Sequence, residues 1–247
     1  QASLAQAAGS QLRRPLLSLN LGGVHQHAQM DDTKTIILVR HGETLGNIRF
    51  RSAVVCFKRF LKCRCPSRYE LTMAFDIIRV LVCCRMGEIF RDPQLSATGQ
   101  AQAADVAEQF RTDGFIRKEG IELVVHSTLR RTGDTCKALF GDAGIRTEEE
   151  SIFREWYFAE TSGCCSTDGS WPQRIEACRV WLASRPERVI AVVGHGMLFQ
   201  ALQSGSGATH FGNVEVRRCM FNVQTKTFDA GKLLFRPSMP SLGEEPV

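Results

Sequence analysis

The chain has 247 residues, of which 43% are hydrophobic and 23% charged, so it is long enough for one sizeable α/β domain with its own core. The formal net charge of +5 suits an anionic substrate, and no interleaving of aromatic and basic residues indicates a nucleic-acid partner. The best candidate for a transmembrane segment, residues 71–90, carries four charged residues and is rejected on that ground.

Residues 1–30 contain no acidic residue and are rich in Ala, Gln, Ser, Gly and Leu. We interpret them as a disordered extension, and an acid-poor transit peptide is the alternative. The ten cysteines are scattered, which is typical of reduced thiols rather than of a secreted disulfide framework. The composition therefore predicts a cytoplasmic protein, or an organellar one if residues 1–30 act as a transit peptide.

The first predicted strand is the apolar, β-branched run of residues 35–39, which is typical of a buried strand in a parallel sheet. Arg40 and His41 follow it directly, at the end of the strand where open α/β sheets bind ligands. A neutral imidazole is a competent nucleophile, and an adjacent guanidinium binds an anion through two parallel hydrogen bonds. This pair of residues therefore indicates phosphoryl chemistry.

The block of about residues 50–90 is rich in basic residues and holds five cysteines. Its apolar residues recur loosely at helical spacing, which predicts one or two helices over the mouth of the site. We interpret its basic run as a solvated face, with contact to an acidic substrate or a membrane surface as alternatives. A zinc site is disfavoured, because the C-x-C and C-C spacing of its cysteines is not a usual zinc framework. The cysteines in question are Cys63, Cys65, Cys83 and Cys84.

A helix is predicted after Asp92, with Ser96 or Thr98 as its cap. A second core strand, residues 121–127, ends in a serine and leads into a helix that carries two consecutive arginines at 130 and 131. On a helix their side chains point about 100° apart, so only one of the two is expected to face the site.

An acidic hinge is predicted at residues 148–150, and Glu155 and Glu160 lie in the segment that follows it. Residues 161–170 are rich in Gly, Ser, Thr and Cys, which predicts a flexible loop. A helix with proline in its first turn is predicted over residues 171–183.

A third core strand, residues 189–193, is followed by Gly194, His195 and Gly196 and then by a short helix. The glycines let the backbone approach a ligand, and the amino end of a helix favours anions. Because the carboxyl ends of parallel strands meet at one edge of the sheet, we expect His195 to lie near His41.

The remaining elements complete a single predicted domain. Residues 213–235 read as antiparallel edge strands, and residues 237–247 as a disordered tail. We therefore predict one domain over residues 31–236, with the cysteine-rich block at about residues 50–90 as an insertion.

Four motifs together resemble the signature of the histidine phosphatase superfamily, which includes the phosphoglycerate mutases. The motifs are R-H-G-E-T at residues 40–44 with Asn47, D-x-x-L-S-x-x-G-x-x-Q-A at residues 92–103, S-x-L-x-R at residues 127–131 and V-x-H-G at residues 193–196. The third motif has Thr128 where proline is usual, and its register selects Arg131 over Arg130. The resemblance covers roughly residues 34–49 and 91–223.

This resemblance implies an α/β three-layer sandwich with a mostly parallel central sheet and helices on both faces. It also implies that His41 attacks phosphorus to give a phosphohistidine, that Glu155 is the general acid, and that neither metal nor cofactor is required. Glu160 is the alternative to Glu155. The implied site residues are His41, Glu155 and His195 for catalysis and Arg40, Thr44, Asn47, Arg131 and Gly196 for substrate binding.

We therefore predict a phosphatase that hydrolyses phosphomonoesters, with a phosphorylated small molecule or, alternatively, a phosphoprotein as substrate. A phosphoglycerate mutase is the first alternative, although the short loop at residues 161–170 and the plain carboxyl-terminal tail argue against it. A catalytically impaired protein that binds phosphorylated ligands is the second. The sequence predicts neither the identity of the substrate nor the oligomeric state.

Overall fold

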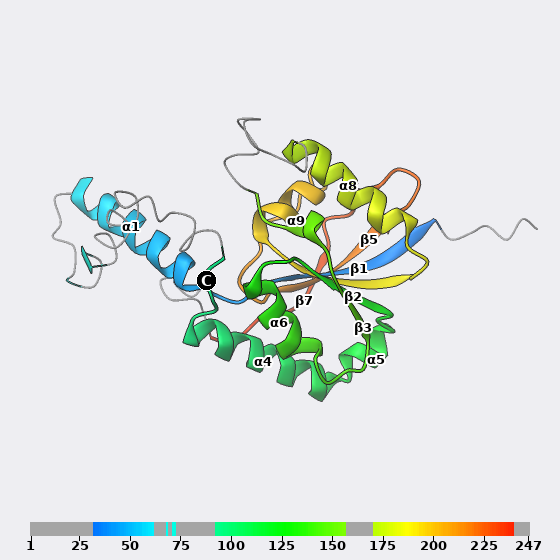
Figure 1. The fold of residues 1–247 in the computed structure, drawn as a ribbon, viewed down its shortest axis with the longest axis horizontal. Coiled ribbons are helices and arrows are strands. Elements are labelled where there is room, and N and C mark those ends of the chain that lie inside the picture. Colours follow the sequence, from blue (N-terminus) through cyan, green and yellow to red (C-terminus); the bar gives the residue numbers. More distant parts are fainter. Residues whose placement is uncertain (1–31, 62–67, 69–70, 73–91, 157–169, 240–247) are drawn as a thin grey trace, which may run out of the picture. The chain divides into compact units, whose positions relative to one another are not determined.

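The computed structural model describes residues 32–61, 68, 71–72, 92–156 and 170–239. By its internal contacts the chain divides into residues 1–30 and residues 31–247, and every described residue belongs to the second unit. Within the described ranges, seven strands form one sheet in the order β3-β2-β4-β1-β5-β6, with β7 also paired to β5 (Figure 1). The strands are β1 (Thr33–Arg40), β2 (Leu123–His126), β3 (Arg146–Glu149), β4 (Val189–Gly194), β5 (Val216–Asn222), β6 (Thr227–Phe228) and β7 (Lys232–Phe235).

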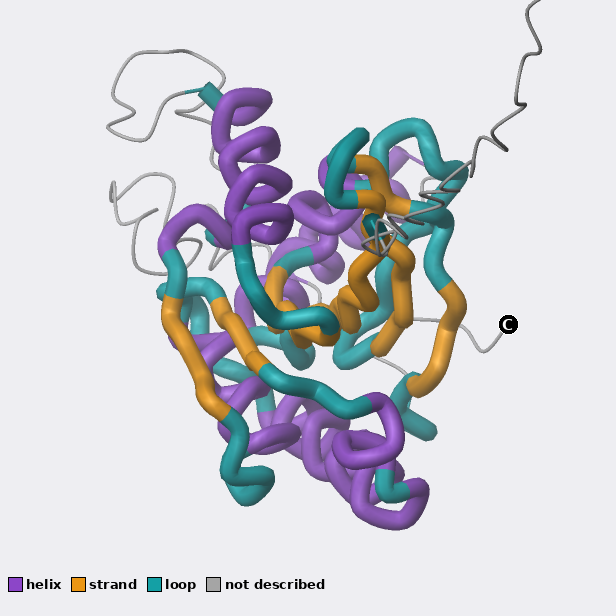
Figure 2. The backbone as a smooth tube through the Cα atoms, turned by 90° about the vertical axis from the view of Figure 1, so that its right-hand side faces the viewer, coloured by secondary structure: helices purple, strands orange, loops and turns teal. Residues whose placement is uncertain are grey.

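Helices connect these strands and cover the sheet. They are α1 (Leu45–Leu61), α4 (Ala97–Asp113), α5 (Phe115–Glu119), α6 (Arg130–Phe140), the 3-10 turn η1 (Ser151–Phe153), α8 (Trp171–Ser184) and α9 (Gly196–Leu202). Figure 1 shows α8 and α9 on one side of the sheet and α4, α5 and α6 on the other. In Figure 2 the strands, in orange, lie side by side among the helices, in purple.

The sheet is mostly parallel. Strand β1 pairs in parallel with β4, β4 with β2, and β2 with β3, whereas β5 is antiparallel to β1 and to its partners β6 and β7. The parallel core with helices on both faces confirms the predicted fold class. The predicted antiparallel strands after residue 213 are likewise confirmed.

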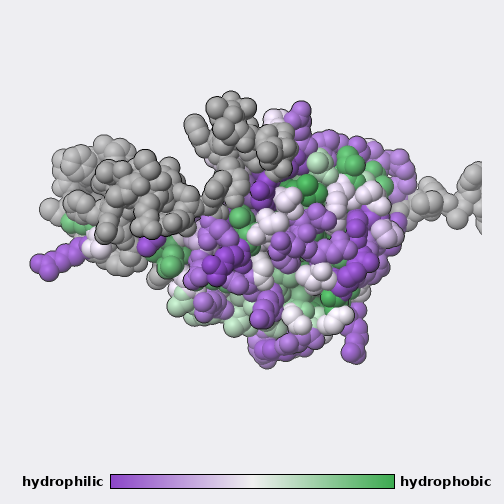
Figure 3. Space-filling view, in the orientation of Figure 1, coloured by the Kyte–Doolittle hydropathy of each residue, from purple (hydrophilic) through white to green (hydrophobic). Residues whose placement is uncertain are grey.

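Two hydrophobic clusters fill the space between the layers, because successive residues of β1 point to opposite faces. Ile36 and Leu38 pack with residues of α8 and α9, whereas Ile37 and Val39 pack with residues of α4 and α6. All four side chains are fully buried. The face of the molecule in Figure 3 is mainly hydrophilic with scattered apolar residues, as expected outside such a core.

The acidic hinge predicted at residues 148–150 is wrong, because Glu148 and Glu149 belong to strand β3. This strand lies at the edge of the sheet, where charged side chains reach solvent or partners. Glu148 accepts a hydrogen bond from Arg185 at 2.9 Å and forms an ion pair with Arg146 at 3.2 Å. Edge position and pairing therefore let an acidic run form a strand.

Several predicted segments lie partly or wholly outside the described residues. Helix α1 begins at Leu45, earlier than the helices predicted within residues 50–90, and Cys63, Cys65, Cys83 and Cys84 lie outside the described residues. The structure describes the predicted tail only as far as residue 239, where the backbone N–H of Ser238 donates to Asp105 at 2.6 Å. No helix in the described ranges has the length and apolar character needed to cross a membrane.

Ser96, rather than Thr98, caps helix α4. Its Oγ accepts a hydrogen bond from the backbone N–H of Gly99 at 3.0 Å and donates one to the buried carboxylate of Glu43 at 3.0 Å. Gly99 lies so close to Glu43 that a Cβ at this position would be 2.0 Å from the Glu43 carbonyl oxygen. The start of α4 is therefore joined tightly to the loop after β1.

We expect Ser96→Ala to lower the free energy of unfolding by about 2–3 kcal/mol, because it removes both the helix cap and a hydrogen bond to a buried carboxylate. Thr98→Ala is the matched control and should change it by less than about 0.5 kcal/mol. Urea unfolding followed by circular dichroism measures both variants. Equal destabilisation by the two substitutions would contradict this account of the cap.

Candidate functional site

The loop after β1 places His41 at the carboxyl edge of the sheet. Its backbone N–H donates to the Gly194 carbonyl at the end of β4, at 3.0 Å. Its ring Nδ1 lies 2.7 Å from the Gly42 carbonyl oxygen. Because a carbonyl oxygen only accepts hydrogen bonds, Nδ1 carries the ring proton, and Nε2 of the neutral ring is left with its lone pair.

The environment of His41 keeps the imidazole neutral. Burial lowers the pKa of His41 well below its ordinary value of 6.5, and the positive charges of Arg131 and Arg40 lower it further. The hydrogen bond to Gly42 acts in the opposite direction but does not offset them. His41 is therefore an unprotonated, oriented imidazole near neutral pH.

His195 lies beside His41, at the end of β4. It is the N-cap residue of α9, and its ring centroid is 5.2 Å from that of His41, with the planes inclined at 63°. Its Nε2 lies 3.1 Å from Ser127 Oγ at the end of β2. Burial and then Arg131 lower the pKa of His195 well below 6.5, so this ring is neutral as well. Among the described residues, its buried Nδ1 has no hydrogen-bond partner.

Arg40 and Arg131 supply positive charge that acts on both rings. Arg40 is buried and donates from Nη1 to the Phe211 carbonyl at 2.6 Å. Arg131 exposes only 6% of its surface and forms an ion pair with Asp92, with Nη1 and Oδ1 3.7 Å apart. Arg130 is exposed, and its backbone N–H donates to the same Asp92 at 3.0 Å. The two arginines thus differ in environment, as their positions on a helix predict.

Thr44 and Asn47 hold each other at the start of α1. The Thr44 N–H and Oγ1–H donate to Asn47 Oδ1 at 3.0 and 2.8 Å, and the Asn47 N–H donates to Thr44 Oγ1 at 3.1 Å. This reciprocal pattern is a capping box, which satisfies backbone donors at a helix terminus. The structure therefore shows a structural task for both residues besides the substrate contacts predicted for them.

Gly196 follows His195 and permits a close approach of Arg40. A Cβ at position 196 would lie 3.3 Å from Arg40 Nε, tighter than ordinary van der Waals contact. A larger residue here would press on the guanidinium. Gly196 therefore shapes the site through Arg40.

Glu155 lies in the loop after η1, partly buried near the two arginines. Burial raises the pKa of Glu155, and this effect outweighs the opposing hydrogen bond from the Trp156 N–H and the charges of Arg131 and Arg40. The Trp156 N–H lies 3.0 Å from Glu155 Oε1. Glu155 is thus a carboxyl group that keeps its proton to higher pH than an ordinary glutamate. Glu160, the predicted alternative, lies outside the described residues.

Arg174 holds the Glu155 loop in place, a contact that was not predicted from the sequence. Its buried guanidinium donates to the carbonyls of Ile152 at 3.0 Å, Arg154 at 2.5 Å and Glu155 at 3.1 Å. Because α8 carries Arg174, this helix positions the loop from outside the site. A single arginine on a predicted helix carries no sequence signal for such a contact.

Two further residues contact the site: Thr135, which the sequence did not single out, and Ser127, which belongs to the S-x-L-x-R motif but had no role assigned to it. Ser127 contacts His195, and Thr135 Oγ1 accepts a hydrogen bond from the Gly42 N–H at 3.1 Å. The position of Ser127 at the end of a core strand was the available signal. Among the described residues, no cluster of three or more His, Cys, Asp or Glu side chains could hold a metal ion.

These residues define an α/β protein in which two neutral histidines, two arginines and a glutamate lie around the carboxyl edge of a parallel sheet. Residues 88–179 match the family model of the histidine phosphatase superfamily (branch 1). The match confirms the resemblance of this chain to that superfamily. A comparison with curated proteins gives no match.

Solved structures to which this chain is similar include the following three. Glucosyl-3-phosphoglycerate phosphatase from a mycobacterium, complexed with VO3, is 18% identical, with 83% of this chain and 100% of that chain covered and a TM-score of 0.49. Phosphoserine phosphatase from Entamoeba histolytica, in complex with 3-phosphoglyceric acid, is 19% identical, with 83% and 97% covered and a TM-score of 0.48. Phosphoglycerate mutase from Bacillus anthracis is 14% identical, with 82% and 92% covered and a TM-score of 0.49.

The different environments of the two arginines generate a test. We expect Arg131→Ala to lower kcat/KM for a phosphomonoester by about 100-fold or more, because it removes a buried guanidinium beside both histidines. Arg130→Ala is the matched control and should leave kcat/KM within about twofold, since its side chain is exposed. Steady-state kinetics measure both. Full activity of Arg131→Ala with loss in Arg130→Ala would reverse the assignment.

Proposed function

We propose that this protein is a phosphatase that hydrolyses phosphomonoesters through a phosphohistidine formed at His41. The observation that carries the proposal is the state of His41, which is neutral, has Nδ1 hydrogen-bonded to the Gly42 carbonyl, and is subject to the positive charges of Arg131 and Arg40. In this state the Nε2 lone pair of the imidazole points away from the Gly42 carbonyl that holds Nδ1. Such a group attacks an electrophilic phosphorus without first losing a proton.

Arg40, Arg131 and His195 would bind the phosphoryl group of the substrate. The two guanidinium groups supply positive charge to a dianion, and the buried Nδ1 of His195 supplies a donor if Ser127 donates to Nε2. Catalysis of phosphoryl transfer consists mostly of positioning and of stabilising charge on the equatorial oxygens. These three residues support both, and no metal is needed in the scheme.

Glu155 would move the proton in both steps. In the first, the bond between His41 Nε2 and phosphorus forms, the ester P–O bond breaks, and Glu155 gives its proton to the departing alkoxide. In the second, water attacks phosphorus, Glu155 takes a proton from it, and the P–N bond breaks to release inorganic phosphate. The raised pKa of Glu155 supports this role, because the carboxyl group must begin the cycle protonated.

We expect His41→Ala to abolish hydrolysis of p-nitrophenyl phosphate, because it removes the attacking atom. The fold should remain, since the substitution removes little core, and circular dichroism checks this. Wild-type turnover should survive EDTA. If the wild type does not turn over this substrate, a phosphoglycerate mutase assay distinguishes a strict mutase from a protein that only binds phosphorylated ligands; either result would refute the proposed hydrolysis.

We expect Glu155→Gln to slow hydrolysis of alkyl phosphates by about 100-fold or more, and p-nitrophenyl phosphate far less, because only a poor leaving group needs the proton. In the wild type, the rate for alkyl phosphates should fall as pH rises through the raised pKa of Glu155, since the carboxyl group then loses its proton. Protonation of His41 should stop the reaction only well below pH 6.5. Pre-steady-state rates measured against pH test this, and an equal loss on both substrates would remove Glu155 from the proposed role.

A further inference from the structure

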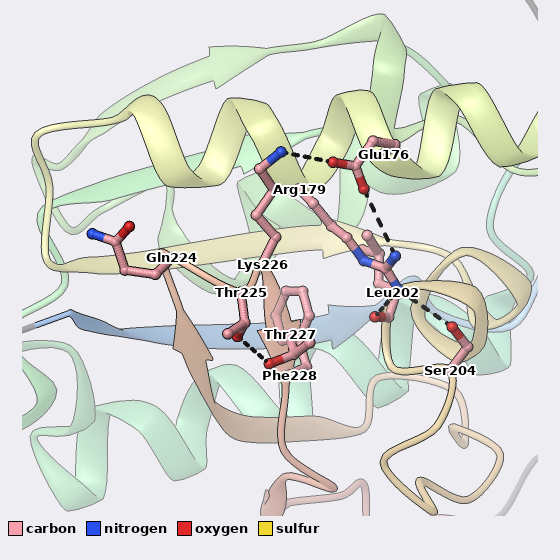
Figure 4. Close-up of a pocket in the computed structure, with 9 residues that line it drawn as sticks. All are labelled: Glu176, Arg179, Leu202, Ser204, Gln224, Thr225, Lys226, Thr227 and Phe228. Carbon is pink, nitrogen blue, oxygen red and sulfur yellow. Dashed lines mark hydrogen bonds and ion pairs between the residues drawn. The ribbon is translucent and has the colours of Figure 1, made fainter.

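A cavity of about 280 Å³ lies between α8, the end of α9 and the turn that joins β5 to β6 (Figure 4). The turn follows Asn222, which pairs with Thr33 at the start of β1, whereas His41 follows the end of β1. The cavity therefore lies near the end of the sheet where β1 begins, whereas the histidines lie at the end where β1 and β4 finish. None of the candidate site residues lines it.

Two cations in this cavity share one carboxylate. Lys226 Nζ donates to Glu176 at 2.8 Å, and Arg179 Nη1 lies 3.9 Å from the other oxygen of Glu176. The other described residues that line it are uncharged, so the described lining carries one positive charge in excess. Figure 4 shows both cationic groups directed toward Glu176 from different elements. The carboxylate of Glu176 neutralises only one of the two positive charges, so a bound anion would neutralise the other.

Arg179 is fixed before any ligand arrives. Its Nη2 donates to the carbonyls of Ala201 at 3.3 Å and Leu202 at 2.9 Å, and to Ser204 Oγ at 3.3 Å. These bonds orient the planar guanidinium at the end of α9, while Nη1 is directed toward the cavity. A preoriented guanidinium loses little conformational entropy when it binds an anion.

Lys226 is held in an uncommon backbone conformation. Its φ is 55°, in the left-handed region, which costs a residue with a side chain about 1–2 kcal/mol. The turn is supported by the Thr225 N–H, which donates to Asn222 Oδ1 at 2.8 Å, and by a 2.7 Å contact between the hydroxyls of Thr225 and Thr227. The turn thus places a lysine, rather than the glycine that this conformation favours, over the cavity.

We propose that this cavity binds a small organic anion with a phosphate or carboxylate group. The anionic group contacts Lys226 and Arg179 as Lys226 exchanges Glu176 for the ligand, the hydroxyls of Ser204 and Thr225 bind its polar body, and Phe228 forms an apolar wall. The volume is near the lower end of the range for small-molecule sites, which suits a body of a few carbon atoms. This site stands independently of the proposed catalytic function.

Amide-resolved NMR of the 247-residue chain tests the proposal, because it locates binding on the chain. Inorganic phosphate and malonate are the two probes, which separate a phosphate ligand from a carboxylate one. We expect saturable shifts of the backbone amides of residues 204 and 224–227 with at least one probe. Shifts at residues 41–47 report the candidate catalytic site separately, so either site can fail without the other.

Matched lysine variants make the test specific. Lys226→Gln should weaken binding at these amides by about tenfold or more, the value of one charge-assisted hydrogen bond, and Lys226→Arg should restore it. Lys118→Gln is the control, because Lys118 is also an exposed lysine in an ion pair, with Asp113, but lies outside the cavity. The proposal is overturned if neither probe shifts the cavity amides, if sodium chloride at equal ionic strength shifts them equally, or if both glutamine variants bind as the wild type does.

Discussion

The parallel pairing of β1 with β4 is the constraint on which the candidate site depends. In this register Arg40 lies opposite Gly194, and the N–H of His41, the first residue after β1, donates to the Gly194 carbonyl. The two strands therefore end together, and the histidines that follow them meet with their rings 5.2 Å apart. A slip of β1 by one residue would turn its side chains to the other face of the sheet. The fully buried residues of β1 oppose such a slip, because each face carries its own hydrophobic cluster.

The electrostatics of the site follow from burying arginines beside histidines. Arg131 lowers the pKa of both His41 and His195, so the guanidinium groups that suit an anionic substrate also keep the imidazoles unprotonated. The same charges act in the opposite sense to burial on Glu155, whose pKa is nevertheless raised. Burial disfavours the charged form of each group. It therefore keeps the two imidazoles unprotonated and the Glu155 carboxyl group protonated, although all three lie near the same arginines.

Much of this arrangement was predictable from local sequence. Short apolar runs are recognisable as buried strands, and the polar residues that follow them can then be placed at the strand ends. The three core strands and the approach of His195 to His41 belong to this class, whereas the choice of Arg131 over Arg130 came from the register of the S-x-L-x-R motif in the family resemblance. Contacts between side chains that are distant in the sequence were not predictable in this way. Arg174 holds the Glu155 loop from another helix, and the capping box of Thr44 and Asn47 depends on where α1 begins. Strand β3 was missed because an acidic run has little strand character until its edge position and partners are known.

One contact in the loop after β1 bears on how the chain tolerates length changes. Thr44 forms a β-bridge with Leu95, and the Leu45 N–H donates to the Gln94 carbonyl at 3.3 Å, so the chain leaves this point and returns to it. The chain between residues 45 and 94 therefore starts and ends at one place on the domain. Since the entropy of closing a loop grows only slowly with its length, the domain can accept insertions or deletions there at little thermodynamic cost. The same junction offers a natural place to graft a foreign peptide or a shorter linker while the strands on either side keep their register.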